Sequence, residues 1–332
     1  MPESAHGPVF MAGIDLGGTW LRVGLAGPEG EIRQRRRART AGSEGPSGVL
    51  AQIEELVRTV VAAEPAARLD RLVLAIGAPG PVDSGAGVVE GAPNLPGWRR
   101  VPMRDKLERA LGCRCLVEHD ANLGALAEHR RGAGRGTSDF VYVTVSTGIG
   151  AGLILDGHLY RGYQGSAGEF GHVIVVPDGP LCNCGHRGCL EAIASGTALA
   201  RAAGVANASE VTRLAAAGDQ KAQAILAWAA RHLGHALGGL INLLNPEVVA
   251  LGGGVVASSP TFWGEVLARI PDAVFPSIGN RCRVERAELG EEQGLIGAVE
   301  LALDFVKDHS DQLIESLASP SDPAGAGSRR RR

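Results

Sequence analysis

Three cysteines lie close together in a glycine-rich segment, CNCGHRGC. Cys182, Cys184 and Cys189 have the spacing C-x-C-x4-C, which is typical of metal ligands rather than of a disulfide framework. Three thiolates need a fourth ligand to complete a tetrahedral zinc site, and both His172 and His186 are candidates. A site closed by three thiolates and one imidazole shapes its loop rather than activating water. The alternative is a polar loop that carries three free thiols.

Glycine-rich turns follow three separate apolar runs of the chain. Without a Cβ the backbone can approach a ligand closely, and successive N–H groups in such a turn form a concave site for anions. Threonine hydroxyls add donors, and a carboxylate at the first turn is suited to hold Mg²⁺ beside a triphosphate. Neither of the first two turns has the GxxxxGK[ST] pattern of a P-loop. The sequence predicts a phosphate and nucleotide site built from Asp15, Gly17, Gly18, Thr19, Thr147, Gly148, Gly150, Gly252, Gly253 and Gly254.

Three carboxylates stand in small or apolar surroundings and are candidates for acid–base chemistry or for binding a polyol. Asp120 follows a strand-like run and precedes a helical one, a position where the active sites of α/β proteins gather. The same position suits a helix N-cap, so both interpretations of Asp120 stay open here. Glu169 and Glu191 bracket the cysteine segment. A loop fixed by zinc would hold both of them in place.

Short apolar runs alternate with amphipathic segments, which predicts parallel sheets flanked by helices. The runs RLVLAIG and VVALG are typical of buried strands. Apolar spacing predicts helices over 47–63, 103–111, much of 198–241 and 294–306. The segments GIDLGGTWLRVGL at 13–25 and VTVSTGIGAGLIL at 143–155 each form a strand, a turn of small residues and a second strand. This repeat predicts two similar halves that face a shared cleft.

The composition bounds the class of protein. The chain has 332 residues, of which 45% are hydrophobic, so its length favours two domains with substantial cores. A formal net charge of −3 argues against nucleic acid as a partner. The N-terminus has no secretory signal pattern, and no apolar run is long enough to span a membrane. We therefore expect a cytoplasmic protein with no membrane partner.

Two arginine-rich segments remain outside these motifs. The first carries Arg33, Arg35, Arg36, Arg37 and Arg39, and we expect an exposed edge strand or loop there, with anion binding as the alternative. The second closes the low-complexity tail SPSDPAGAGSRRRR, and residues 317–332 are expected to be disordered.

Taken together, these motifs resemble the ROK family of bacterial sugar kinases and regulators, over about residues 11 to 305. GIDLGGTWLRVGL and VTVSTGIGAGLIL are similar to its two phosphate motifs, and VVALGGGV is similar to its adenosine motif. GEFGH followed by CNCGHRGCLE resembles its signature and its zinc motif, CxCGxxGCxE. The nearest likeness is to the glucokinase branch.

The resemblance implies an α/β architecture, the actin-like ATPase (ribonuclease H-like) fold, with two α/β domains around a central cleft. Residues 1–118 would form the smaller domain, with a C-terminal helix at about 299–310 packing back on it, and residues 119–298 the larger domain with the zinc loop. A structural Zn²⁺ would be held by His172, Cys182, Cys184 and Cys189, which leaves His186 as a loop residue. A homodimer or a dimer of dimers is implied as well.

The same resemblance implies glucokinase activity, in which a phosphoryl group would pass from Mg²⁺–ATP to the 6-hydroxyl of glucose. Asp120 would be the general base, and the sugar would contact Glu169, His172, Glu191 and Asn94. Many family kinases have Asn where this chain has His119, so the preferred hexose is open between glucose, mannose, fructose, N-acetylmannosamine and N-acetylglucosamine. Polyphosphate is the alternative donor.

A second class of function is a sugar-sensing regulator, which the same family includes. Its DNA-binding members carry a helix-turn-helix domain before the first phosphate motif, which here begins at Gly13. Twelve residues are too few for such a domain, and 33 basic against 36 acidic residues give no basic excess. A regulator without a DNA-binding domain is the remaining non-enzyme alternative.

Overall fold

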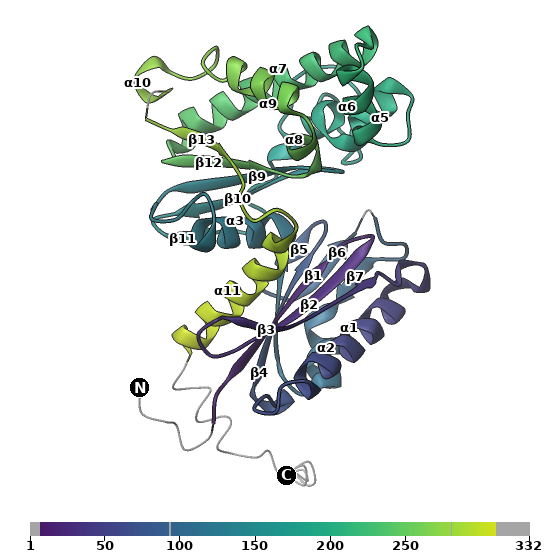
Figure 1. Cartoon of the computed structure of the whole chain (residues 1–332), viewed down its shortest axis with the longest axis vertical. Coiled ribbons are helices and arrows are strands. Elements are labelled where there is room, and N and C mark those ends of the chain that lie inside the picture. Colours follow the sequence, from purple (N-terminus) through teal and green to yellow (C-terminus); the bar gives the residue numbers. More distant parts are fainter. Residues whose placement is uncertain (1–6, 93, 280, 310–332) are drawn as a thin grey trace, which may run out of the picture.

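The computed structural model describes residues 7–92, 94–279 and 281–309. The arginine-ending tail that we expect to be disordered lies outside the described residues. Within the described residues the chain forms two lobes, each built on one five-stranded sheet (Figure 1). We call them the first and the second lobe, in chain order.

The first lobe is a mixed sheet with the strand order β3-β2-β1-β4-β8. β1 pairs antiparallel with β2, which pairs antiparallel with β3, and β1 pairs parallel with β4, which pairs parallel with β8. Two helices and a small antiparallel sheet, β5-β6-β7, complete the lobe. The elements are β1 (Phe10–Leu16), β2 (Trp20–Ala26), β3 (Ile32–Arg39), α1 (Gly45–Ala62), β4 (Leu72–Ala78), β5 (Val82–Asp83), β6 (Val88–Gly91), β7 (Arg99–Pro102), α2 (Met103–Leu111) and β8 (Arg114–His119).

The second lobe repeats this pattern with the strand order β11-β10-β9-β12-β13. Its first three strands are antiparallel, and β12 and β13 extend the sheet in parallel. The strands are β9 (Phe140–Val145), β10 (Ile149–Leu155), β11 (His158–Tyr160), β12 (Val248–Gly252) and β13 (Arg283–Arg286). The helices are α3 (Asp120–Arg131), α4 (Glu191–Ala194), α5 (Gly196–Ala203), α6 (Ala208–Ala216), α7 (Gln220–Leu244), α8 (Gly254–Ser258), α9 (Pro260–Arg269) and α10 (Pro276–Gly279).

The two sheets thus share one topology, an antiparallel hairpin followed by parallel strands. The repeat predicted at 13–25 and 143–155 corresponds to β1–β2 and β9–β10, the first hairpin of each sheet. Because the turns of both hairpins follow equivalent strands, the short sequence repeat marks equivalent positions in the two lobes. Every residue of β4 and of β12 is buried, as their uninterrupted apolar runs predict.

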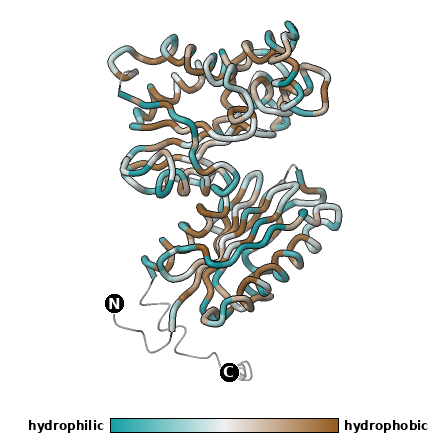
Figure 2. Tube along the Cα trace, viewed as in Figure 1, coloured by the Kyte–Doolittle hydropathy of each residue, from teal (hydrophilic) through white to brown (hydrophobic). Residues whose placement is uncertain are grey.

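Side-chain pattern and caps define the helices. In α7 the buried Leu226, Leu233, Leu237 and Ile241 recur at helical spacing, so one stripe faces the core of the second lobe. The helix begins where Asp219 accepts a hydrogen bond from the backbone N–H of Ala222. Figure 2 shows this amphipathic banding, with brown and teal alternating along the helices and with the arginine-rich edge strand β3 in teal. The prediction of an edge strand at 33–39 is confirmed.

The last helix, α11 (Gln293–Asp308), confirms the helix predicted from apolar spacing over 294–306, overlaps the one implied at about 299–310, and contacts both lobes. It packs on β1 of the first sheet and on α3, which lies against β9 and β10 of the second. Glycines permit this close approach: a Cβ on Gly13 would lie 2.8 Å from the Leu295 carbonyl oxygen, and one on Gly297 would lie 1.9 Å from that of Leu123. The helix is therefore shared between the lobes rather than packed on the first alone (Figure 1).

Candidate active site

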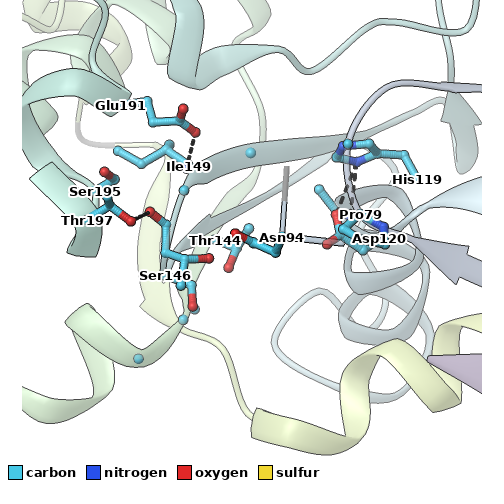
Figure 3. Close-up of a pocket in the computed structure, with 18 of the residues that line it drawn as sticks. Pro79, Asn94, His119, Asp120, Thr144, Ser146, Ile149, Glu191, Ser195 and Thr197 are labelled. Carbon is cyan, nitrogen blue, oxygen red and sulfur yellow. Dashed lines mark hydrogen bonds and ion pairs between the residues drawn. The ribbon is translucent and has the colours of Figure 1, made fainter. Parts of the chain in front are cut away.

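A cavity of about 920 Å³ lies between the two lobes. Its walls combine Asp15 from the end of β1, Asp120 from the start of α3, the turn between β9 and β10, and the glycines after β12. In Figure 3, Glu191 and Thr197 lie at one side of this cavity and His119 and Asp120 at the other, with Asn94 and Thr144 between them. The carboxyl ends of parallel strands from both sheets therefore meet at one cleft.

Asp120 is the first residue of α3, but it does not cap that helix. The N-cap is His119, whose Nδ1 accepts a hydrogen bond from the backbone N–H of Ala121 at 3.2 Å. The N-cap interpretation of Asp120 is therefore wrong, because the preceding imidazole already occupies the capping position. The Asp120 side chain is 46% exposed, and its one polar contact among the described residues is His119 Nδ1 at 3.4 Å. Its carboxylate is thus available to a ligand in the cleft.

Asp15 is the second carboxylate of the cleft, and its environment is unusual. Burial raises the pKa of Asp15 to about 6, although Arg22, 2.9 Å away, opposes the shift. The charge of Asp120 raises this pKa as well, so the two carboxylates interact electrostatically. Arg22 also pairs with Glu291 at 2.7 Å, just before α11. Oxygen ligands and excess negative charge are what Mg²⁺ requires, so the donor set at Asp15 suits that ion.

The turn between β9 and β10 is held from outside by hydrogen bonds. The Glu191 carboxylate accepts one from the backbone N–H of Ile149 at 3.0 Å, and the Thr197 hydroxyl donates one to the Thr147 carbonyl at 2.8 Å. A Cβ on Gly148 would lie 2.6 Å from the Glu191 carboxylate, so only glycine allows this approach. These contacts therefore fix the shape of the turn.

The glycines after β12 form another part of the cavity wall. Gly252, Gly253 and Gly254 line the cavity, and Gly253 has a φ of +91°. A Cβ there would lie 2.3 Å from the Val145 carbonyl oxygen. The backbone at this point therefore requires glycine both for its conformation and for its packing.

The first turn is placed differently from the prediction. Asp15 lines the cavity, whereas Gly17, Gly18 and Thr19 are outside its wall, and the last two are exposed. Gly18 instead packs against Asn94. A Cβ added to this glycine would lie 2.8 Å from the Cβ of Asn94. Asn94 itself lines the cavity.

The sequence argument missed Arg22, Thr144 and Ser146, which all line the cavity. The alternation of residues along β1, β2 and β9 could have indicated these three residues, because alternate residues of a strand lie on one face.

The cysteine cluster assembles as expected from its spacing. The ligand atoms of His172, Cys182, Cys184 and Cys189 lie within 4.8 Å of one another. The sulfurs of Cys184 and Cys189 are 3.6 Å apart, and Cys182 Sγ lies 3.7 Å from His172 Nδ1. Zinc–sulfur bonds of about 2.3 Å in a tetrahedron place two sulfurs about 3.8 Å apart, so these residues fit zinc.

His186 lies outside this group of four, although its Nδ1 is 3.6 Å from Cys184 Sγ. The local chain explains how the cysteines converge. Cys182 donates its N–H to the His186 carbonyl at 2.8 Å, and Gly185 with a φ of +93° closes the turn between them.

The imidazole of His172 faces two sites at once. Its Nδ1 points to the cysteines, whereas its Nε2 lies 3.8 Å from a carboxylate oxygen of Glu169. Both residues line the cavity, as do Asn94, His119 and Glu191. The predicted sugar-contacting residues are thus brought to one cavity from four separate segments of the chain.

Most of the arginines at 33–39 are paired. Arg35 lies 3.0 Å from Glu292, Arg37 lies 3.7 Å from Glu291, and Arg33 contacts Glu31. The guanidinium groups of Arg37 and Arg39 lie 3.9 and 4.3 Å from the Trp20 ring centroid. These contacts dock the edge strand against the start of α11 and neutralise much of its charge.

Comparison with known proteins now decides the family. The model of the ROK family matches residues 11–305. The chain belongs to the ROK family. It is 36% identical to the glucokinase of Thermotoga maritima over 310 residues, covering 88% of this chain and 96% of that one. It is 33% identical to an N-acetylmannosamine kinase of Escherichia coli over 299 residues, covering 87% and 97%.

A solved structure of the ROK family glucokinase from Streptomyces griseus, in complex with glucose and AMPPNP, superposes with a TM-score of 0.73. It is 33% identical, and the match covers 90% of this chain and all of that one. The protein therefore has the actin-like ATPase fold that the sequence predicted. No described helix is both long and apolar enough to cross a membrane.

Proposed function

We propose that this ROK family protein is an ATP-dependent sugar kinase that phosphorylates the 6-hydroxyl of glucose. The observation that carries the proposal concerns Asp120, which does not cap α3. Its carboxylate lines the same cleft as the glycine turn at 147–149, which hydrogen bonds hold in place. The likeness to glucokinases over most of the chain supports glucose as the acceptor.

In the proposed reaction Asp120 acts as the general base. It accepts the proton of the 6-hydroxyl while that oxygen forms a bond to the γ-phosphorus and the bond from this phosphorus to the ADP oxygen breaks. Mg²⁺ held near Asp15 would neutralise charge on the phosphates when bound. The backbone N–H groups of the second glycine turn and the glycines after β12 would hold ATP in line with the sugar.

The sugar would lie against the side chains that share the cavity with Asp120. Glu169 and Glu191 would accept hydrogen bonds from its hydroxyls, and His172 would offer Nε2 while Nδ1 holds Zn²⁺. Asn94 and His119 would complete the pocket. In this proposal zinc is structural, because four protein ligands close its coordination sphere.

A second acceptor class, the 2-acetamido hexoses, is favoured by one observation. The N-acetylmannosamine kinase of E. coli is 33% identical to this chain, against 36% for the glucokinase of T. maritima. An acetamido group and a hydroxyl differ in size and in hydrogen bonding, so one pocket favours one of them.

ADP release tests the proposal directly. The purified protein is assayed with Mg²⁺–ATP against glucose, mannose, fructose and the two N-acetylated hexosamines, with polyphosphate as an alternative donor. Rapid turnover on glucose supports the proposal, and turnover only on an N-acetylated sugar moves the substrate but keeps the mechanism. No turnover on any sugar by folded, zinc-loaded protein rejects the kinase and favours a sugar-sensing role.

A further inference from the structure

Glu118 is a buried carboxylate at the end of β8, immediately before His119 and Asp120. Its side chain is only 1% exposed, yet both of its oxygens are fully engaged. One oxygen accepts hydrogen bonds from the Ser84 hydroxyl at 3.0 Å, the His119 backbone N–H at 2.9 Å and the Asn122 amide at 2.9 Å. The other accepts from Arg161 Nε at 2.6 Å. A carboxylate this buried needs such partners, because an unpaired charge there costs several kcal/mol.

These partners come from four different parts of the fold. Ser84 lies in the turn between β5 and β6 of the first lobe, and Asn122 lies in the first turn of α3. Arg161 follows β11 in the second lobe. Glu118 therefore links the chain segment that carries Asp120, the proposed base, to both lobes.

Arg161 opens the loop that leads to the sugar-facing residues. Its carbonyl accepts a hydrogen bond from the N–H of Ala167 at 3.0 Å, which closes the loop on itself. The next residue, Gly168, accepts one from the N–H of Ala151 in β10, also at 3.0 Å. A Cβ on Gly168 would lie 2.2 Å from the Ala151 carbonyl oxygen, so the chain is pressed against β10 just before Glu169. The position of Glu169 is thus tied at one end to Arg161.

We propose that Glu118 is a positioning residue, which through Arg161 holds the loop 161–169 and its Glu169 carboxylate at a fixed place relative to Asp120. The inference rests on the proposed function for its kinetic consequence, but the geometry itself does not depend on it. Glu118 touches neither sugar nor nucleotide in this scheme. It acts by fixing the positions of Asp120 and Glu169, which are proposed to contact the sugar.

Two substitutions break the link from opposite sides. Glu118→Gln keeps the size of the side chain but removes its negative charge, so the ion pair with Arg161 is lost. If the amide NH2 faces the guanidinium, the hydrogen bond is lost as well, because two donors then meet. Arg161→Met removes the guanidinium from a side chain that is 38% exposed, so this variant is expected to fold even if the buried change is not tolerated. Arg161→Lys keeps the charge and is expected to restore part of the effect.

Glu128, on the helix that follows Glu118, provides a matched control. It is fully buried, and its carboxylate accepts hydrogen bonds from the backbone N–H groups of Ala133, Glu288 and Leu289 at 2.8 to 3.1 Å. It lies near the C-terminal end of α3, and in the described part of the chain it makes no hydrogen bond or ion pair with the loop 161–169. Glu128→Gln therefore weakens a buried carboxylate network without touching the proposed link.

The first readout is amide hydrogen exchange of the peptide that spans residues 161–172, measured without sugar or nucleotide. We expect exchange there to rise about tenfold in Glu118→Gln and Arg161→Met, and to stay at the wild-type rate in Glu128→Gln. Unchanged exchange in both variants overturns the inference, as does an equal rise in the control. This measurement holds whether or not the protein turns over a hexose.

The second readout separates positioning from general destabilisation. The KM for the sugar is expected to rise about tenfold in Glu118→Gln and Arg161→Met, the KM for ATP to stay within twofold, and the double variant to be no worse than either single one. Faster loop exchange with an unchanged sugar KM overturns the inference while leaving the kinase proposal intact. Absence of turnover in the wild-type protein rejects the kinase proposal alone.

Discussion

The imidazole Nδ1 of His119 lies 3.4 Å from the Asp120 carboxylate while it accepts a hydrogen bond from the next backbone N–H of α3. Because Nδ1 accepts this hydrogen bond, Nε2 is the ring nitrogen that can donate one. His119 thus caps the helix, and the partly exposed oxygens of Asp120 stay available to a ligand in the cleft.

Asp120→Asn should bind sugar and nucleotide but lose turnover. The amide keeps the shape of the side chain and cannot accept a proton, so we expect kcat to fall about 10³-fold. Because Asp120 does not cap α3, the melting temperature should stay close to that of the wild type. Steady-state kinetics together with thermal unfolding check both points. A variant that keeps a tenth of the wild-type kcat would refute the role as general base.

His119→Asn should change the choice of sugar without loss of stability. Asparagine is a good N-cap residue, so it can replace the hydrogen bond to Ala121, whereas His119→Ala should lose about 1 kcal/mol of unfolding free energy. Because His119 lines the cavity in which we propose that the sugar binds, the ratio of kcat/KM for glucose and N-acetylmannosamine should shift in both variants. An unchanged ratio would remove His119 from the pocket.

Asp15 should give the activity an acid limb near pH 6. Its pKa is raised by burial to about 6, so below that pH the carboxyl is neutral and holds Mg²⁺ poorly. We expect kcat/KM for Mg²⁺–ATP to fall as the pH drops through this value. The raised pKa also means that Asp15 favours the folded state when protonated and that this contribution is lost as the pH rises through about 6. In the nucleotide-free protein, Asp15→Asn should flatten stability against pH over that range.

Removal of zinc should expose one reactive thiol before the others. The backbone N–H of His186 holds the pKa of Cys184 down to about 6, whereas burial raises the pKa of Cys189 to about 12. After treatment with a chelator, an alkylating reagent at pH 7 should therefore modify Cys184 first. Mass spectrometry of the labelled peptides identifies the site. Equal labelling of the zinc-loaded and chelated protein would argue against a metal at the cluster.

Gly297→Ala should weaken the contact between α11 and α3. A Cβ there would lie 1.9 Å from the Leu123 carbonyl oxygen, and overpacking of this kind costs about 2 kcal/mol of unfolding free energy. Gly239→Ala in α7 is the matched control, because a Cβ there meets no atom within 4 Å. That change should stabilise the helix by about 1 kcal/mol. Denaturant unfolding of the two variants gives opposite shifts if the close approach is real.

Local pattern was enough to predict much of the fold. Glycine turns, apolar runs and the cysteine spacing are properties of short segments, so the hairpins, the fully buried β4 and β12, and the convergence of Cys182, Cys184 and Cys189 could be predicted from sequence. The repeat at 13–25 and 143–155 predicted two similar halves, and the two sheets do share one topology. Each of these features depends on residues that are neighbours along the chain.

Other features were decided only when distant segments met. The pairing of Asp15 with Arg22 depends on the register of β1 against β2. Glu191 reaches the glycine turn at Ile149 from 42 residues away, and Glu118 meets Arg161 from 43. Such contacts carry no local signal, because burial and electrostatic partners are set by how sheets and helices pack. The sequence by itself was enough to identify the candidate carboxylates, glycine turns and cysteines. Only the tertiary structure determined which of them face one another.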